Sequence, residues 1–151
     1  MKTNRLIFSI MAAALVAALA PKVHAAAEHT HIQGILISAS NDRGETDRRL
    51  SAYEPTLRRI LRFESYRFLG DDSASLDVPA NGHLSLGEGN ELEIQTESSD
   101  GRSVRLKVRW LKGGRTLMST GLALRPGVPA VIGGPSTGHK GDVYAVILVG
   151  R

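Results

Sequence analysis

The chain has 151 residues, a formal net charge of +4 and no cysteine. Without cysteine it forms no disulfide bond and takes no lipid at a cysteine after a leader. A chain of this length can bury one hydrophobic core without covalent cross-links, so we expect one globular domain.

The N-terminal segment has the pattern of a secretory signal peptide. Lys2 and Arg5 give it a basic start, and residues 6–20 form an uncharged apolar run. This run is shorter than the ~20 residues that a membrane-spanning helix needs. We therefore expect a signal peptide over residues 1–25, with cleavage possible to 27, and a single β-rich globular domain over residues 26–151. This predicts a periplasmic or secreted protein with no integral membrane span once the leader is removed.

Removal of the leader also changes the charge balance. Lys2, Arg5 and Lys22 leave with it, so 16 basic and 15 acidic residues remain, a net charge of +1. Nucleic-acid binding requires a concentrated basic surface. We therefore expect no nucleic-acid partner.

The first part of the domain predicts a strand followed by a helix. Residues 32–38 are mostly apolar and favour a largely buried strand, and residues 38–44 form a polar loop. Residues 47–61 have the apolar spacing of an amphipathic helix. Pro55 interrupts this spacing, so it either kinks a long helix or marks the first turn of a shorter one beginning near Glu54. The apolar stripe consists of Leu50, Tyr53, Leu57, Ile60 and Leu61.

The opposite face of the predicted helix carries four arginines, Arg48, Arg58, Arg59 and Arg62. They form a possible interaction face for an anionic partner. The alternative is an ordinary solvated helix face, which the near-neutral charge of the mature chain favours.

The next residues predict short strands separated by turns. Residues 63–69 favour a strand, residues 70–73 a turn, and residues 75–78 a short edge strand that Pro79 ends. Residues 83–124 then predict a meander of antiparallel strands, because apolar and polar residues alternate along them.

The register of the meander follows from keeping its apolar side chains on one face. A loop at residues 99–101 places Ile94 opposite Leu106, and a loop at residues 112–114 places Trp110 opposite Thr116. Upstream, a turn at residues 88–90 uses Asn90 in the left-handed conformation. The other face then opposes acidic to basic residues, with Glu93 opposite Lys107 and Glu91 opposite Arg109. This is an ordinary solvated face or, alternatively, a charged ligand surface.

The C-terminal part predicts two further strands. Residues 128–132 favour a short strand, and the Gly-rich residues 133–141 favour a mobile loop. Residues 142–149 are apolar on both faces, which is typical of a central strand. The fold class predicted for the whole domain is α+β and β-rich, with an antiparallel meander, in a mixed sheet or a sandwich, and one packed helix.

The sequence contains no strong catalytic, cofactor or metal motif. Residues 133–141 differ from a phosphate-binding loop because Gly141, rather than Ser or Thr, follows Lys140. His29 and His31 are fewer than the about three or four ligands of a zinc site. We therefore expect no cofactor, no metal and no catalytic set.

One alternative catalytic set remains open. Ser136, His139 and Asp142 supply the residue types of a Ser/His/Asp arrangement, without the Gly-x-Ser-x-Gly elbow. Serines and aspartates in Gly-rich segments are more often turn formers.

Two local patterns resemble known bacterial proteins. Leu122-Ala-Leu-Arg-Pro-Gly-Val-Pro-Ala-Val-Ile-Gly-Gly134 resembles the strand–turn–strand of secretins, the outer-membrane pore subunits. Asp47-x-x-Leu50-x-x-Tyr53-x-x-x-Leu57, followed by Phe63-x-x-Tyr66 and by Gly133-Gly134, is similar to small exported bacterial proteins of unknown function. The first resemblance implies association with a secretion apparatus, and the second implies a place in the cell envelope.

These observations favour an exported, non-enzymatic envelope protein that binds or scaffolds a partner protein through an exposed edge such as residues 75–78. One alternative is a small periplasmic hydrolase with its site near the loops at residues 38–44 and 133–141. Another is an accessory subunit of an outer-membrane secretion complex. The sequence leaves the oligomeric state open.

Overall fold

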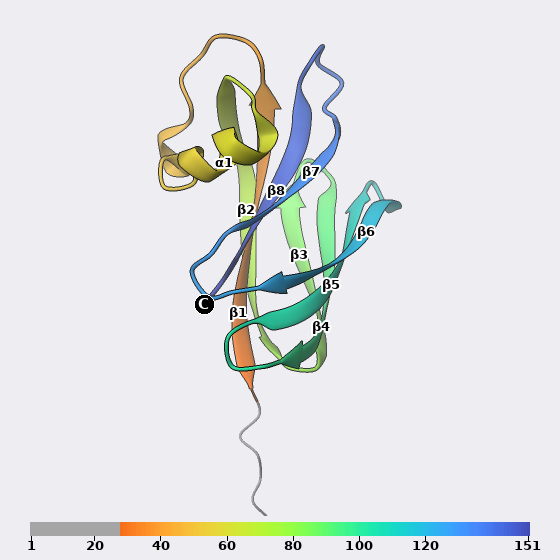
Figure 1. The fold of residues 1–151 in the computed structure, drawn as a ribbon. Coiled ribbons are helices and arrows are strands. Elements are labelled where there is room, and N and C mark those ends of the chain that lie inside the picture. The colour runs from red at the N-terminus through yellow and green to blue at the C-terminus, as the bar shows by residue number, and fades with distance from the viewer. Residues whose placement is uncertain (1–27) are drawn as a thin grey trace, which may run out of the picture.

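The protein is described by a computed structural model, in which residues 28–151 are described, and the predicted signal peptide lies outside these described residues. The elements are β1 (His29–Ser40), the short 3-10 helix η1 (Arg48–Leu50), α1 (Glu54–Leu61), β2 (Ser65–Asp77), β3 (Ala80–Gly87), β4 (Asn90–Ser99), β5 (Val104–Lys112), β6 (Arg115–Leu124), β7 (Ala130–Ser136) and β8 (Val143–Gly150). The strands form two four-stranded sheets, sheet A in the order β2-β1-β8-β7 and sheet B in the order β3-β4-β5-β6 (Figure 1). All neighbouring strands pair antiparallel, which confirms the predicted β-rich fold with one helix.

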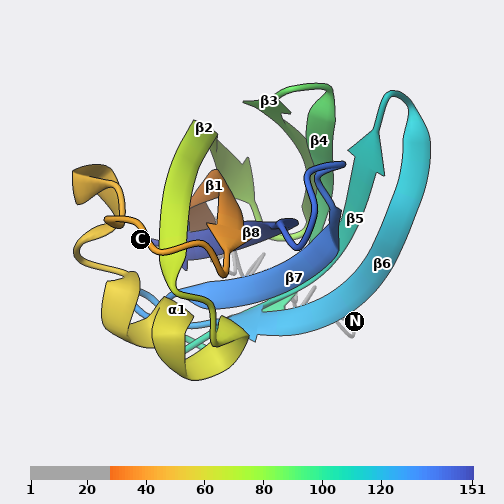
Figure 2. The ribbon, with the colours of Figure 1, turned by 90° about the horizontal axis from the view of Figure 1, so that it is seen from above.

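Sheet A is the middle layer of the molecule. Its inner face packs against sheet B in a core that includes Ile32, Trp110 and Val146. Its other face is covered by η1 and α1, through Leu50 and Leu57, in a second core (Figure 2). A sheet covered on both faces needs apolar residues at consecutive positions of its central strands.

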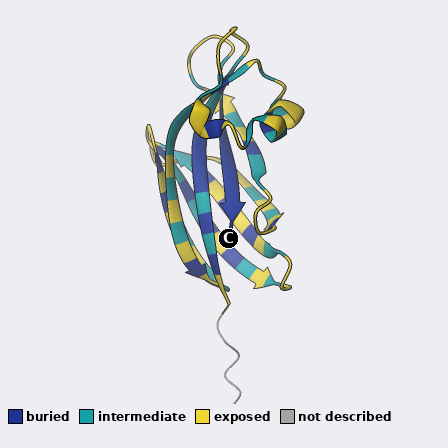
Figure 3. Ribbon diagram, turned by 90° about the vertical axis from the view of Figure 1, so that its left-hand side faces the viewer, coloured by how far each residue is buried: buried dark blue, intermediate teal, exposed yellow. Residues whose placement is uncertain are grey.

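The strand β8 shows this two-sided burial most clearly. Val146 and Leu148 belong to the core between the sheets, whereas Ala145 and Ile147 belong to the core under the helix. Figure 3 shows the continuous burial along the strand that ends at the C-terminus, beside the largely exposed helix. The predicted central strand is therefore confirmed.

The helix is the shorter of the two predicted alternatives. It begins at Glu54 with Pro55 in its first turn, where the missing N–H of proline costs no hydrogen bond. Asp47 caps the separate η1, and Arg62 ends α1 in the left-handed conformation. Ile60, which belongs to the predicted apolar stripe, remains 48% exposed.

The turn predicted at residues 70–73 is wrong, because β2 continues through it. Gly70 lies in the strand beside β3, where a β-carbon would lie 2.1 Å from the carbonyl oxygen of Leu86. Glycine at this position allows the two backbones to approach each other rather than to turn. The pairing of β2 with β1 is continuous except for one irregularity, opposite Leu36 and Ile37.

The predicted register of the meander is also wrong, although its faces are right. Ile94 lies opposite Val108 instead of Leu106, and Trp110 lies opposite Met118 instead of Thr116. An irregularity in the pairing precedes each turn, between Thr96 and Ser98 and again beside Leu111. The turns also differ in length from the predicted ones, and turn and irregularity together shift each pairing by two positions, so the apolar residues stay on the inner face.

Two further predictions, a left-handed Asn90 and a mobile loop at residues 133–141, are also corrected. Asn90 is not in the left-handed conformation, which falls on Glu88 and its glycine neighbours. Instead Asn90 is fully buried, and its Oδ1 accepts a hydrogen bond of 3.0 Å from Nε1 of Trp110. The predicted mobile loop at residues 133–141 is shorter than expected, because β7 continues to Ser136.

Candidate functional site

The two sheets meet along one side of the molecule. Gly70 of β2 approaches the backbone of Leu86 on β3, as described above. The backbone N–H of Ser85 on β3 also donates to Asp72 Oδ2 on β2 at 2.9 Å. The edges of sheets A and B on this side therefore lie against each other. The predicted edge at residues 75–78 belongs to this side, where Ser75 pairs with His31 and Asp77 pairs with His29 of β1.

On the opposite side of the molecule, β6 and β7 are the outermost strands, and within residues 28–151 neither pairs with the other as a sheet neighbour. β7 contains Pro135, which protects an edge because proline has no N–H to donate. β6 has no proline, and Arg115 at its start is its single charged residue. We name residues 118–124, the regular part of β6 after its irregularity, the open edge.

The side chains of the open edge divide between two surfaces. Met118 and Leu122 pack against the core between the sheets but are only partly buried. Ser119, Gly121 and Ala123 point to the outer face of sheet B, because they lie opposite outward-facing residues of β5. The open edge therefore offers a backbone without a partner strand, an apolar row on one face and small residues on the other.

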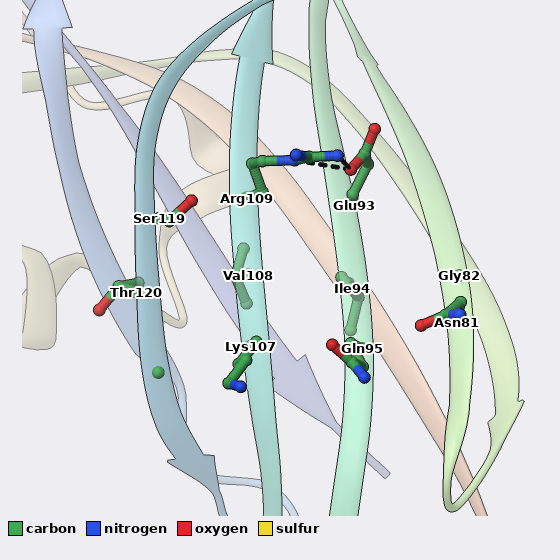
Figure 4. Close-up of a pocket in the computed structure, with 11 residues that line it drawn as sticks. Asn81, Gly82, Glu93, Ile94, Gln95, Lys107, Val108, Arg109, Ser119 and Thr120 are labelled. Carbon is green, nitrogen blue, oxygen red and sulfur yellow. Dashed lines mark hydrogen bonds and ion pairs between the residues drawn. The ribbon is translucent and has the colours of Figure 1, made fainter.

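A hollow of about 740 Å³ lies on the outer face of sheet B beside the open edge. Its lining consists of Asn81, Gly82, Glu93, Ile94, Gln95, Lys107, Val108, Arg109, Ser119, Thr120 and Gly121. Figure 4 shows the side chain of Arg109 directed at Glu93, whereas Ile94 and Val108 point to the other side of the sheet. The hollow continues onto β6 because Ser119 and Gly121 add little side-chain volume opposite Arg109 and Lys107.

The charges of this outer face are largely paired. Arg109 binds Glu93 directly across the strands, and Lys107 Nζ lies 3.1 Å from Glu97 Oε1. Both predicted pairs are wrong, because Glu91 lies opposite Leu111 and Lys107 lies opposite Gln95, but one acidic residue, Glu93, does lie opposite a basic residue, Arg109. Exposed pairs of this kind stabilise a protein by only ~0.2–1 kcal/mol each. The hollow is therefore polar but close to neutral.

A second, smaller cleft of about 300 Å³ lies where the hydrolase alternative places its site. The loop after β1 and Asp142 line it together, with Ser40, Asp42 and Ser65 among its polar residues. Ser65 Oγ donates to the carbonyl oxygen of Asp42 at 3.1 Å, so this hydroxyl is used in holding the loop.

The alternative catalytic set shares one loop without forming a relay. Ser136 Oγ accepts from the backbone N–H of Gly138 at 3.3 Å, and the backbone N–H of His139 donates to a neighbouring threonine. Asp142 lines the smaller cleft, but Ser136 and His139 do not. Within residues 28–151, no hydrogen bond joins the hydroxyl, the imidazole and the carboxylate of this set.

The predicted arginine face is partly used by the fold. Arg58 Nε donates to Glu54 Oε1 at 2.8 Å, and its guanidinium also donates to the carbonyl oxygen of Glu64 at 3.0 Å. This arginine therefore ties the helix to the chain entering β2. Arg48, Arg59 and Arg62 are exposed.

The neighbouring Arg49 binds Asp47 at 2.7 Å and lies 4.1 Å above the ring of Phe68. Hydrogen bonds from the side chain and backbone of Arg49 lower the pKa of Asp47 to about 2.

His29 and His31, near the start of the domain, lie on one face of β1. His29 Nδ1 lies 2.5 Å from Asp77 Oδ1, and His31 Nδ1 lies 3.0 Å from Ser75 Oγ. In the part of the chain that the structure describes, no three His, Asp or Glu residues gather as metal ligands would. The helices of the same part are too short and too polar to cross a bilayer.

The sequence analysis did not identify the open edge, although a signal was present. Acidic or basic residues alternate along β4 and β5, and this alternation stops after Arg115. The segment that resembles secretins runs from the end of β6 into β7, two strands that belong to different sheets. Comparisons of the chain with protein-family models, with curated proteins and with solved structures found no match.

Proposed function

We propose that this protein is an exported, non-enzymatic envelope protein that binds or scaffolds a partner by pairing with an extended segment along the open edge. The observation that carries this proposal is the uncharged, proline-free open edge of β6 at the outside of sheet B. Folded proteins normally protect such an edge with charges, proline or a covering segment. Here the irregularity near Leu117 protects only the start of the strand.

The two surfaces beside the open edge give the added strand its binding energy and its specificity. Main-chain hydrogen bonds supply affinity in strand addition, and alternate side chains of the added segment supply specificity. Its inward side chains would cover Met118 and Leu122, which remain partly exposed. Its outward side chains would enter the hollow over Ser119 and Gly121. We therefore expect a segment that alternates apolar and small or polar residues.

Site-specific photo-cross-linking in the cell tests this proposal. A photoreactive residue at Ser119 is expected to capture one defined segment of one envelope protein, identified by mass spectrometry of the cross-linked peptide. The matched control is Ser85, an exposed serine on β3 at the far edge of the same sheet. Equal capture from Ser119 and Ser85 would contradict a role for the open edge.

The charge variant Thr120→Lys places a cation on the inner face of the open edge and is expected to abolish capture from Ser119. Its melting temperature gives the control for folding, because Thr120 lies at the outside of the core. Co-fractionation of the captured partner with outer-membrane complexes would identify the protein as an accessory subunit of a secretion apparatus.

A second candidate function is a small hydrolase at the cleft of about 300 Å³. It is favoured by the meeting of the loop after β1 with Asp142. Under this alternative, single replacement of a polar residue that lines this cleft, Ser40, Asp42 or Asp142, by alanine abolishes hydrolysis of ester or peptide substrates while the melting temperature stays close to that of the wild type. A scaffold tolerates the same replacements in its partner capture.

A further inference from the structure

We infer that the strand that pairs with the open edge is β6 of a second copy of this chain, so that two copies form one continuous sheet about a two-fold axis. This inference rests on the proposed function, because it names the partner of the same edge. The resulting sheet joins the four strands of sheet B in each copy. Most soluble homodimers are closed by such a two-fold, self-complementary contact.

The regular part of β6 defines where the axis lies. Regular pairing with β5 extends from Met118 to Leu124, and Gly121 is the middle residue of this segment. Antiparallel self-pairing that uses the whole segment therefore places Gly121 opposite Gly121 of the second copy. A shift by a single residue would oppose inward to outward side chains, which the pleat forbids.

The side chains of the open edge are complementary to themselves in this register. On the outer face, Ser119 lies opposite Ala123 of the second copy, so only small side chains meet. On the inner face, Thr120 lies opposite Leu122, and Met118 lies opposite Leu124. The segment contains no charge, so no like charges oppose each other.

The partly exposed core of sheet B gives the self-pairing its apolar driving force. Met118 and Leu122 are only partly buried at the open edge, whereas Leu124 at its end is already buried in its own chain. A second β6 continues the same inner row of apolar residues from each core into the other. The open edge has no charge that would select a charged foreign segment. A second β6 has the same alternation of inward and outward side chains that the open edge needs in its partner.

The pairing would also join the two hollows. Ser119, Thr120 and Gly121 line the hollow on the side of β6, next to the inferred axis. In the dimer these residues of both copies line the middle of one longer depression across the joined sheet. The second copy therefore contributes residues to the surface that each copy presents.

Single cysteine variants test the register directly, because the natural chain has no cysteine. Gly121→Cys places two thiols opposite each other at the axis, within the Cα separation of about 4.4–6.8 Å that a disulfide requires. A β-carbon fits there, since its nearest atom is the carbonyl oxygen of Leu106 at 3.8 Å. We expect Gly121→Cys to oxidise quantitatively to a covalent dimer and the matched exposed variant Ser85→Cys to remain monomeric. Equal oxidation of both variants would overturn the inference.

Paired charge variants test the same contact without a covalent bond. In Ser119→Glu/Ala123→Glu, like charges oppose each other twice across the axis, whereas in Ser119→Glu/Ala123→Lys opposite charges do. Sedimentation equilibrium of the processed wild type is expected to show a concentration-dependent dimer. The Glu/Glu variant is expected to raise its dissociation constant by about tenfold or more, and the Glu/Lys variant to stay near the wild type. A dimer unaffected by the Glu/Glu variant would overturn the inference.

The outcome also separates this inference from the proposed function. A wild type that is monomeric at every concentration overturns self-pairing. If the photoreactive residue at Ser119 then still captures one defined segment of another envelope protein, strand addition stands with a foreign partner. If Ser119 captures nothing and the protein is monomeric, both proposals fail.

Discussion

The indole ring of Trp110 occupies the space that a side chain at Gly134 would need. A β-carbon at Gly134 would lie 2.4 Å from Cη2 of Trp110 and 3.0 Å from the carbonyl oxygen of Tyr144. Trp110 belongs to sheet B and Gly134 to sheet A, and Trp110 is fully buried. The contact of the Trp110 ring with the backbone at Gly134 therefore sets how closely β5 of sheet B packs against β7 of sheet A.

Gly134→Ala is expected to destabilise the protein by about 1–3 kcal/mol, the usual cost of overpacking a core. The added methyl group must displace either the Trp110 ring or the backbone of β8. Chemical denaturation followed by far-UV circular dichroism measures the change. The matched control is Gly133→Ala, whose β-carbon would meet only the end of the Leu61 side chain at 3.8 Å. Equal destabilisation by both variants would contradict this explanation.

Asn90→Ala is expected to cost about 1–3 kcal/mol, because it leaves the buried Nε1–H of Trp110 without an acceptor. The fluorescence of Trp110, the single tryptophan of the chain, should also shift as its hydrogen bond is lost. The double variant Asn90→Ala/Trp110→Phe removes donor and acceptor together. Its destabilisation should be smaller than the sum of the two single changes, and simple additivity would refute the role of this hydrogen bond.

Gly70→Ala is expected to be the most damaging of the glycine replacements. Its β-carbon would lie 2.1 Å from the carbonyl oxygen of Leu86, and a backbone atom cannot move aside as a flexible side chain can. We expect a loss of stability greater than the about 1–3 kcal/mol of ordinary overpacking. Gly121→Ala, with 3.8 Å to the nearest backbone oxygen, is the control that should fold normally.

Asp47 is expected to make stability depend on pH in acid. Its pKa in the fold is about 2, below the ordinary value of 3.8, so its ionised form stabilises the native state above pH 3.8. That contribution is lost as the pH falls from 3.8 toward 2. Asp47→Asn keeps a capping oxygen but not the charge. The difference in melting temperature between wild type and Asp47→Asn should be largest above pH 3.8 and should shrink as the pH falls through 2.

The exposed Arg48 provides the matched control for this measurement, since no ion pair of it is seen within residues 28–151. Arg48→Ala should leave the pH dependence of the melting temperature unchanged, whereas Arg49→Ala should reduce it as Asp47→Asn does. A pH-independent difference for Asp47→Asn would contradict the link to its carboxylate.

The elements and the inward faces of the fold follow from hydrophobic periodicity, but the register does not. The alternation at Ile94, Val108 and Trp110 correctly predicts which side chains lie inside. The pairing irregularities beside the turns have no signature in the alternation, so the alternation alone predicts the wrong register. A shift of two residues leaves every face unchanged, and the pattern therefore cannot detect it.

Glycine is the other source of the incorrect predictions, because its local and its long-range roles look alike in a sequence. Gly70 and Gly134 both suggested a turn or a loop, and both lie in strands where another part of the chain needs the space. That need arises from residues on other strands, Leu86 and Trp110. For the candidate site, the open edge was visible only as a loss of charge along β6, and its position at the outside of a sheet required the topology.

The order of strands in sheet A has a consequence for how the chain folds. The hairpins of sheet B join neighbours in sequence, whereas sheet A is held together by β1 against β8, with Ile32 opposite Gly150. Contacts between residues so far apart close large loops and slow folding. Until β8 arrives, β1 has only β2 as a sheet neighbour, so Ile35 and Ile37 on one face and Leu36 on the other lack the β8 side chains of their two cores. The folding rate is therefore expected to depend on how fast β8 pairs with β1.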